Sequence, residues 1–440
     1  REGVVKLNAE PAPRPRMDDE FEAWSRGRGA HSVGLARLRR ESSARRGQDK
    51  TVLRTAQSSV WEGWRVSGFL ALMTSRLLRF VGLSYFAWWM FLRLCGFATV
   101  LLPAFLRLVW RYAVSPDIVR DWYGPHRRQS VDVYLPRDVS RKLRRDGTLG
   151  DDWKPRPCIV FFSGGAWVIG YKAWGALMGF CYSQLGYIFV TPDYRNFPQV
   201  KIEEMLEDVD LAIDWCVDNL PGYGGSHEFV LMGQSAGAHL AASAVLSGLA
   251  RANGVQSAVP ARKEEPLWQL SNIKGFIGVS GPYNLVSLCP HLEQRGLSTS
   301  LLRRLFRRDY NKYSPTMDAK RMRKELDGPL ECPFPLVLIH GTADQTCPSD
   351  QSVEFDRALR KCLAKECAPS LVLLPDMTHT DPIIESPMRG HDVLLSSCLD
   401  HLEQMLGSRE ELGLKSLDES QFKRMLPDSV IDTARYINPF

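Results

Sequence analysis

Short apolar runs alternate with amphipathic stretches along the middle of the chain. Six runs have the length and continuous apolar character of strands buried on both faces of a parallel sheet: 158–162, 188–191, 229–232, 275–280, 335–340 and 370–374. Residues 130–135 alternate between polar and apolar and predict a further strand, and helices are predicted at 202–220, 236–246 and 393–406. Strands that alternate with helices predict the α/β class, with right-handed crossovers and a mostly parallel central sheet covered by helices on both faces.

The same pattern divides the chain into segments. Residues 1–66 are rich in Arg, Ser, Gly, Glu and Pro without a sustained apolar period, which predicts a basic, disordered tail. Residues 67–115 predict an apolar helical segment associated with a membrane. Residues 116–407 form the α/β domain with the candidate catalytic residues, and their polar, Arg-rich stretch 285–330 is predicted to be a lid-like insertion. Residues 408–440 are a C-terminal extension.

The apolar segment is long enough to cross a bilayer but is not uniform. Residues 80–106 are 27 residues interrupted by one charge, Arg93, whereas a span needs about 20 apolar residues. Arg93 lies near the middle, where a charge costs about 3 kcal/mol, and Pro103 would kink or end a helix. One tilted span, two shorter helices in the membrane interface, or an amphipathic hairpin packed on the protein's own core would each fit. Arginines at both ends of the segment, together with aromatic residues, are typical of interface anchors: Arg76, Arg79, Arg107 and Arg111, with Tyr85, Trp88, Trp89 and Trp110.

Charge and cysteine usage narrow the function classes. The net charge of +6 is concentrated in residues 1–79, which hold 16 Lys and Arg against 9 Asp and Glu. A basic tail beside an apolar segment favours a membrane surface over nucleic acid, although a solvated tail has the same composition. The ten cysteines lack CxxC spacing, so neither a zinc site nor a disulfide framework is predicted. We expect no metal and no cofactor, because no phosphate-binding loop or metal-ligand cluster is present.

The candidate nucleophile is Ser235, in the string LMGQSAGAHL with its GxSxG pattern. In this pattern the serine lies on a cramped turn between a strand and a helix, and side chains larger than Gly at the flanking positions would collide with neighbouring backbone. The apolar run 229–232 before the motif and the small, apolar stretch 236–246 after it supply that strand and helix. The alternative is a plain strand-to-helix turn with a capping serine.

A serine nucleophile needs a base and an acid, which in this architecture follow it in the order Asp or Glu, then His. Asp344, in HGTADQT, comes just after a predicted strand, and His379, in DMTHTD, follows the next strand by a loop. We therefore predict Asp344 as the acid and His379 as the base. Other residues could compete for these roles: Asp350, Asp376 and Asp381 for the acid, and His391 and His401 for the base.

Ester hydrolysis also needs N–H groups that stabilise an oxyanion. The string SGGAW follows the predicted strand 158–162, where esterases carry HGGG. The backbone N–H groups of Gly164, Gly165 and Ala166 would converge there with that of Ala236, the residue after the nucleophile. An ordinary glycine turn is the alternative interpretation.

Several longer strings are more specific than GxSxG: GGAWVIGYKAWG (164–175), DYRNFPQ (193–199), LMGQSAGAHLAA (231–242), SGPYNL (280–285), THTD (378–381) and the terminal INPF. From about residue 68 to its end, the chain resembles the plant-type isoprenylcysteine alpha-carbonyl methylesterases, in the carboxylesterase and lipase superfamily. It departs from their pattern at Ser163 and in the insertion at 285–330.

The resemblance implies an α/β-hydrolase fold and hydrolysis of the methyl ester of C-terminal isoprenylcysteine. By matching motif it implies Ser235, Asp344 and His379 as the catalytic residues. Gly164 to Ala166 and Gln234 to Ala236 would line the substrate carbonyl. The implied partners are a prenylated protein or prenylcysteine methyl ester and membrane lipid, at endoplasmic reticulum and Golgi membranes. The catalytic domain would face the cytosol, and the absence of any N-x-S/T site fits that orientation.

The sequence thus predicts a serine esterase specific for prenylcysteine methyl esters. A general carboxylesterase or arylformamidase with a soluble substrate is the first alternative. A non-catalytic ligand-binding receptor on the same fold is the second, but such proteins usually lose a triad member and all three candidates are present here.

Overall fold

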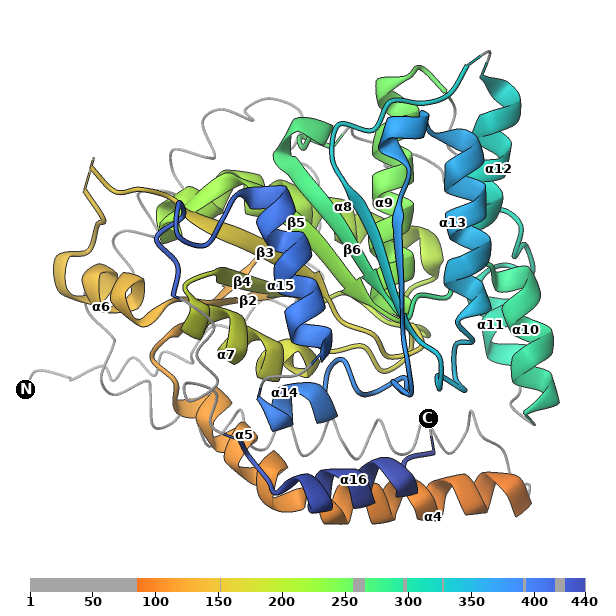
Figure 1. The fold of residues 1–440 in the computed structure, drawn as a ribbon, viewed down its shortest axis with the longest axis horizontal. Helices are drawn as coiled ribbons and strands as arrows, with labels where there is room; N and C mark the ends of the chain where they lie inside the picture. The colour runs from red at the N-terminus through yellow and green to blue at the C-terminus, as the bar shows by residue number, and fades with distance from the viewer. Residues whose placement is uncertain are drawn as a thin grey trace, which may run out of the picture. The chain divides into compact units, whose positions relative to one another are not determined.

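One eight-stranded sheet organises the described part of the chain (Figure 1). The computed structural model describes residues 85–150, 152–255, 266–295, 299–326, 328–390, 393–415 and 424–439. All of these belong to one unit, Gly63–Phe440. The predicted tail at 1–66, the first part of the segment 67–115 and the competing base His391 lie outside the described residues.

The strands lie in the order β1-β2-β4-β3-β5-β6-β7-β8. β1 and β2 pair antiparallel, β2 pairs antiparallel with β4, and the remaining neighbours are parallel. The mostly parallel sheet predicted from the sequence is therefore confirmed. The strands are β1 (Ile118–Trp122), β2 (Ser130–Tyr134), β3 (Arg156–Phe162), β4 (Ile188–Pro192), β5 (Gly225–Gln234), β6 (Ile273–Val279), β7 (Leu336–Gly341) and β8 (Ser370–Leu374). Every predicted strand is present, and β1, an edge strand without a strong apolar pattern, is the additional one.

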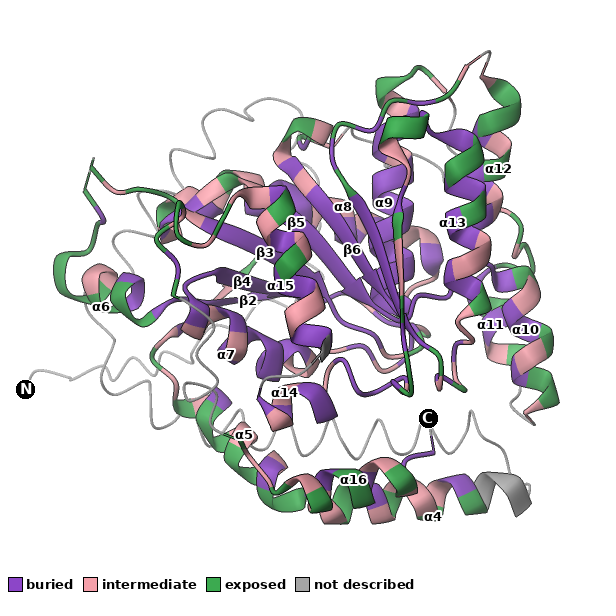
Figure 2. Ribbon diagram, in the orientation of Figure 1, coloured by how far each residue is buried: buried purple, intermediate pink, exposed green. Residues whose placement is uncertain are grey.

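The central strands of the sheet are buried along most of their length (Figure 2). Their side chains alternate between two hydrophobic cores, one on each face of the sheet. One core lies under α7 (Ala176–Leu185) and α15 (Val393–Leu406) and receives Phe161, Met232 and Ile277. The other receives Val160, Leu231 and Phe276 and lies under the remaining sheet-covering helices. These are α8 (Ile202–Asn219), α9 (Ala236–Ala252), α12 (Pro315–Glu325) and α13 (Asp350–Cys362). The apolar runs are continuous because both faces of each central strand are buried.

The predicted insertion 285–330 contains three helices that contribute to the second core. They are α10 (Leu285–Gln294), α11 (Ser300–Leu305) and α12. Their buried side chains include Leu288, Leu302 and Met322. Two further short helices are α6 (Arg137–Asp146), between β2 and β3, and α14 (Glu385–Arg389), after β8.

The apolar N-terminal segment forms two helices, α4 (Tyr85–Val100) and α5 (Leu102–Val114), joined at Leu101. Pro103 lies in the first turn of α5, where its missing N–H costs nothing. Within the described ranges no single helix is long and apolar enough to cross a membrane. The pair bends by 65° and meets that requirement of length and composition only when both helices are taken together.

Candidate active site

The nucleophile elbow lies between β5 and α9, at Ser235. Its φ and ψ of 53° and −125° fall in a region that non-glycine residues rarely adopt, so the turn is held by its surroundings. A Cβ on Gly237 would lie 2.0 Å from the Phe162 carbonyl oxygen, and one on Gly233 would lie 2.6 Å from the Gly237 carbonyl oxygen. Both glycines are therefore required by close backbone contacts, as the GxSxG pattern predicted.

We expect Gly237→Ala to disrupt the elbow, because the added methyl would collide with the backbone of β3. Either α9 or the strand must shift, which should lower the melting temperature by several degrees and reduce ester hydrolysis by about 100-fold. Gly222→Ala is the matched control, since a Cβ there meets nothing within 4 Å. Thermal unfolding and esterase assays on both variants test this, and a Gly237→Ala protein as stable and active as the control would contradict it.

The structure brings together Ser235, His379 and Asp344. His379 Nε2 lies 2.9 Å from Ser235 Oγ, and its Nδ1 lies 2.7 Å from Asp344 Oδ2. Asp344 follows the end of β7 and His379 follows β8, so the three residues meet at the carboxyl edge of the sheet. All three are buried, which strengthens each hydrogen bond by excluding water.

The Asp344 carboxylate is held ionised by its surroundings. Burial acts to raise its pKa, but the charge of His379 and hydrogen bonds from His340 and His379 outweigh burial and hold the pKa well below its ordinary range. The backbone N–H groups of Thr346 and Cys347 donate to Oδ1 at 3.0 and 2.8 Å. The carboxylate can therefore accept a hydrogen bond from His379 Nδ1–H while it stays ionised.

His340 is a neighbour of the triad that the sequence did not single out. It is the next-to-last residue of β7, is fully buried, and its Nδ1 lies 2.7 Å from Ser352 Oγ. Its Nε2–H lies 2.7 Å from the Cys347 carbonyl oxygen and 3.3 Å from Asp344 Oδ2. The shorter distance marks the Cys347 carbonyl as its main acceptor, with Asp344 as a second.

The competing candidates for the acid and the base that lie in the described ranges either make other contacts or are exposed. Asp381 accepts a hydrogen bond from the Thr378 N–H at 2.6 Å and pairs with Arg435 at 3.1 Å. Asp350 and Asp376 are exposed, and Asp350 begins α13. His401 lies on α15, where Nδ1 is 3.4 Å from Gln404 Oε1.

The loop after β3 lies against the nucleophile. A Cβ on Gly164 would meet Gln234 Oε1 at 2.3 Å and Ser235 Cβ at 2.9 Å, so only a glycine allows this approach. Gly165, Ala166 and Trp167 follow with φ of 130°, 49° and 60°, which turns the backbone sharply beside the serine. Ala236 is the first residue of α9, where helix N–H groups have no carbonyl partner inside the helix.

Gln234 has a further contact that its sequence position did not indicate. Its side chain is buried, and Nε2–H donates to the His379 carbonyl oxygen at 3.1 Å. The residue before the nucleophile thus binds the loop that carries the histidine.

The DYRN stretch at 193–196 supports the glycine loop from behind. The Tyr194 hydroxyl donates to the Ser163 carbonyl oxygen at 2.8 Å, and Asn196 Nδ2 donates to the Gly170 carbonyl oxygen at 2.8 Å. Arg128 binds the same Gly170 oxygen at 2.6 Å and pairs with Asp193 at 2.8 Å. These bonds explain why the loop can hold several residues at positive φ.

A buried histidine connects this loop to the insertion. Trp167 Nε1–H donates to His239 Nδ1 at 3.3 Å, and His239 Nε2–H donates to the Tyr313 carbonyl oxygen at 2.7 Å. Burial lowers the pKa of His239 to about 4, so the ring is neutral and can donate and accept as these bonds require. The Phe306 ring contacts the Trp167 ring edge to face, with centroids 5.0 Å apart. The only sequence signal for His239 is a polar residue within an otherwise apolar helix.

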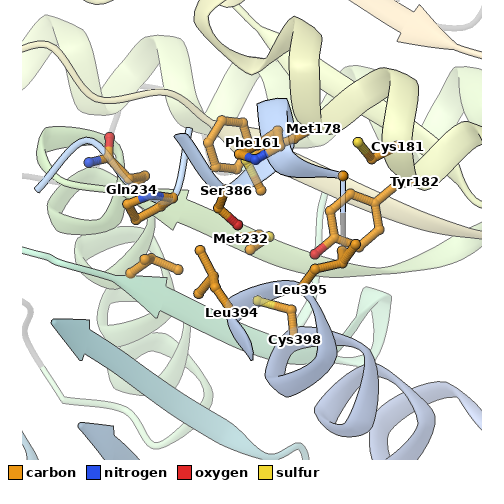
Figure 3. A pocket seen from close by; sticks show the side chains of 14 residues that line it. Phe161, Met178, Cys181, Tyr182, Met232, Gln234, Ser386, Leu394, Leu395 and Cys398 are labelled. Carbon is orange, nitrogen blue, oxygen red and sulfur yellow. The ribbon is translucent and has the colours of Figure 1, made fainter. Parts of the chain in front are cut away.

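A mainly apolar pocket lies on the α7 and α15 face of the sheet, with Gln234 at one end and Tyr182 at the other (Figure 3). Its lining comes from β3, β5, β6, α7, α14, α15 and the turn before α14. The residues are Phe161, Met178, Cys181, Tyr182, Met232, Gln234, Val279, Pro382, Ser386, Pro387, Gly390, Leu394, Leu395 and Cys398. The described residues contain no cluster of three or more potential metal ligands.

Glu385, behind the His379 loop, should make stability depend on pH. Burial raises its pKa to about 7, and nearby Asp381 acts in the same direction. An unfolded glutamate has a pKa near 4.3, so between about pH 4.3 and 7 the folded state binds more protons and stability falls as pH rises. Glu385→Gln keeps the side-chain oxygen and removes this titration.

The check is the melting temperature of wild type and Glu385→Gln between pH 5 and 8. We expect the melting temperature of the wild type to fall relative to that of the variant as the pH rises towards 7. Above pH 7 the difference between the two melting temperatures should be constant. Parallel curves across the whole range would contradict the assigned pKa direction.

Comparison with known proteins supports a single family. Residues 150–359 match the family model described as BD-FAE. The chain is 34% identical to isoprenylcysteine alpha-carbonyl methylesterase ICME of Arabidopsis thaliana, covering 84% of this chain and 81% of that protein. It is 36% identical to the "Probable isoprenylcysteine alpha-carbonyl methylesterase ICME" of Oryza sativa subsp. japonica, covering 83% of this chain and 82% of that protein.

Among solved structures, the apo form of Thermogutta terrifontis esterase 2 is 22% identical, with a TM-score of 0.49, covering 66% of this chain and 96% of that chain. The two plant relatives exceed 30% identity over most of both chains and carry the assignment. The esterase activity in their names agrees with the site described above, where a serine on a strand-to-helix turn lies within hydrogen-bond distance of a histidine. The chain therefore belongs to the isoprenylcysteine alpha-carbonyl methylesterase family, and it is a carboxylic ester hydrolase.

Proposed function

We propose that this protein hydrolyses the methyl ester of C-terminal prenylcysteine, with Ser235 as nucleophile, His379 as base and Asp344 as the acid that orients the base. The observation that carries the mechanism is the chain of hydrogen bonds from Ser235 Oγ through the His379 ring to Asp344, at 2.9 and 2.7 Å. This is the geometry that a general base needs to take the serine proton.

In this mechanism Ser235 Oγ attacks the ester carbonyl carbon while His379 Nε2 takes the hydroxyl proton. The negative charge on the carbonyl oxygen is stabilised by the N–H groups of Gly164, Gly165, Ala166 and Ala236. His379 then gives the proton to the leaving methoxide, and methanol departs. Water, deprotonated by His379, attacks the acyl-enzyme and releases the prenylcysteine carboxylate with Ser235 restored.

The names of two relatives support a prenylated substrate. The Arabidopsis thaliana and rice relatives are named for isoprenylcysteine, and both align with more than four fifths of this chain.

The substrate assignment is tested by comparing two esters, S-farnesylcysteine methyl ester and S-methylcysteine methyl ester, in the same micelles. Release of methanol is measured for both. A prenyl chain contributes about 0.8 kcal/mol per buried methylene, so we expect kcat/KM to be at least about 100-fold higher for the farnesyl ester. Equal values would favour a general carboxylesterase.

We also propose that α4 and α5 rest on a membrane, with the cytosolic faces of the endoplasmic reticulum and Golgi apparatus as the location. Six large apolar side chains on these helices are exposed: Trp89, Leu92, Leu102, Leu106, Trp110 and Val114. The described first turn of each helix carries no acidic residue, and Arg107 and Arg111 lie among the exposed residues of α5. Such a face combines apolar insertion with attraction to anionic headgroups.

Replacing both Leu106 and Trp110 by Glu should weaken binding to vesicles of phosphatidylcholine and phosphatidylserine by about 10-fold or more. Both side chains are more than 60% exposed, so the fold should tolerate the change. Leu267→Glu is the matched control, because Leu267 is equally exposed but lies outside these helices. Co-sedimentation measures the bound fraction, and unchanged binding of the double variant would exclude this face as the contact.

A further inference from the structure

The C-terminal helix α16 (Asp428–Ile437) lies along α4 (Figure 1). Arg93 of α4 donates from Nε to the Ile437 carbonyl oxygen and from Nη2 to the carbonyl oxygens of Tyr436 and Asn438, each at 2.9 Å. The last carbonyls of a helix have no partner inside it, and a cation there also favours the helix dipole. Arg93, which interrupts the apolar run in the sequence, thus fixes the end of the chain.

Beyond α16, the next residue reaches the loop of the catalytic base. Asn438 is buried, and its Nδ2 donates to Thr380 Oγ1 and, at 3.0 Å, to Glu385 Oε1. Thr380 directly follows His379, and its hydroxyl donates to the same Glu385 oxygen at 2.8 Å. The amide, hydroxyl and carboxyl therefore form one buried cluster immediately behind the histidine. One helical turn earlier, Arg435 pairs with Asp381 on the same loop.

The end of the chain also connects to the loop of the catalytic acid. Arg295 donates from Nη1 to the Gln345 carbonyl oxygen at 2.6 Å and from Nη2 to the Pro439 carbonyl oxygen at 3.3 Å. Gln345 directly follows Asp344. Residues 438 and 439 thus lie between the two loops that must hold the acid and base in register.

We propose that Asn438 is a positioning residue that holds the His379 loop in its reactive geometry, and that Arg93 acts with it by fixing the C-terminal carbonyls on α4. This rests on the proposed function, because it assumes that His379 is the base. The side-chain amide of Asn438 binds Thr380 and Glu385, so its effect on His379 passes through these two residues. A displacement of the imidazole by about 1 Å is enough to cost about 100-fold in rate.

The test uses the full chain with Asn438→Ala, assayed with S-farnesylcysteine methyl ester. We expect kcat to fall by about 10- to 100-fold while KM changes by less than about threefold, because binding is retained and only the geometry of proton transfer is lost. Labelling of Ser235 by a fluorophosphonate should slow by a similar factor. Tyr436→Ala is the matched control, since this side chain is 86% exposed on the same helix.

Arg93→Lys is the second variant, which keeps the charge but replaces the fork of Nε and Nη2 by a single nitrogen that cannot reproduce its planar geometry. It should lower kcat by about 3- to 10-fold and remains informative if Asn438→Ala does not fold. Wild-type kcat in both variants, alongside an inactive Ser235→Ala, would overturn the positioning role while leaving the triad intact. Activity that survives in Ser235→Ala would instead overturn the proposed function. A matching loss of kcat in Tyr436→Ala would also overturn the proposal.

Discussion

Replacing Ser235 by Ala is expected to lower kcat for ester hydrolysis by about 10⁶-fold. The hydroxyl is the only group at the elbow that lies within hydrogen-bond distance of His379 Nε2 among the described contacts. Without it no acyl-enzyme forms, and only the oxyanion loop and substrate binding remain to accelerate attack by water. The elbow backbone should be unaffected, because alanine is smaller than serine.

The measurement is hydrolysis of a short nitrophenyl ester together with labelling by a fluorophosphonate, in wild type and variant. Loss of both signals with an unchanged melting temperature would support the nucleophile. Ser243→Ala is a suitable control, since Ser243 is a buried serine of α9 whose hydroxyl donates to the His239 carbonyl oxygen. Substantial turnover by the Ser235 variant would rule out Ser235 as the nucleophile.

The second large effect is expected for Asp344→Asn, with kcat reduced by about 10⁴-fold. The carboxylate accepts a hydrogen bond from His379 Nδ1–H, with Nδ1 and Oδ2 2.7 Å apart, whereas an asparagine can turn its NH₂ group towards the ring. The ring would then carry its proton on Nε2, the atom that must accept the serine proton. His340, Thr346 and Cys347 surround the same carboxylate and would lose a charged acceptor as well.

Asp350→Asn provides the matched control for that prediction. Asp350 also follows β7 and was a competing candidate for the acid, but it is exposed at the start of α13. Steady-state kinetics should show near wild-type kcat for Asp350→Asn and the large loss only for Asp344→Asn. If the two variants behave alike, the acid has been assigned incorrectly.

Local sequence patterns predicted the sheet and placed the candidate catalytic residues just after the ends of its strands. Continuous apolar runs predicted β3 to β7, because strands buried on both faces have no polar positions. The run 370–374 also predicted a strand, but its expected burial was wrong, because β8 is an edge strand in which only Leu374 is buried. Residues just after β7 and β8 were chosen because parallel strands deliver their carboxyl ends to one edge of the sheet. The edge strand β1 was missed because only one of its residues is fully buried, which leaves little apolar signal.

Contacts between distant residues were beyond the reach of these patterns. Arg93 appeared to be an obstacle in an apolar run, yet it binds carbonyls 343 to 345 residues away. No local pattern indicates what His340, His239 and Asn438 contact, and only the tertiary fold shows it. The bend between α4 and α5 was one of several geometries that composition allowed, because length and hydropathy do not fix an angle.

The most direct test of the proposed reaction is methanol release from S-farnesylcysteine methyl ester by the full chain in detergent micelles, with wild type and Ser235→Ala compared at equal concentration. We predict steady release by the wild type and release at the uncatalysed rate by the variant. Equal release by the two proteins, or none by the wild type, would contradict the proposal that Ser235 hydrolyses prenylcysteine methyl esters.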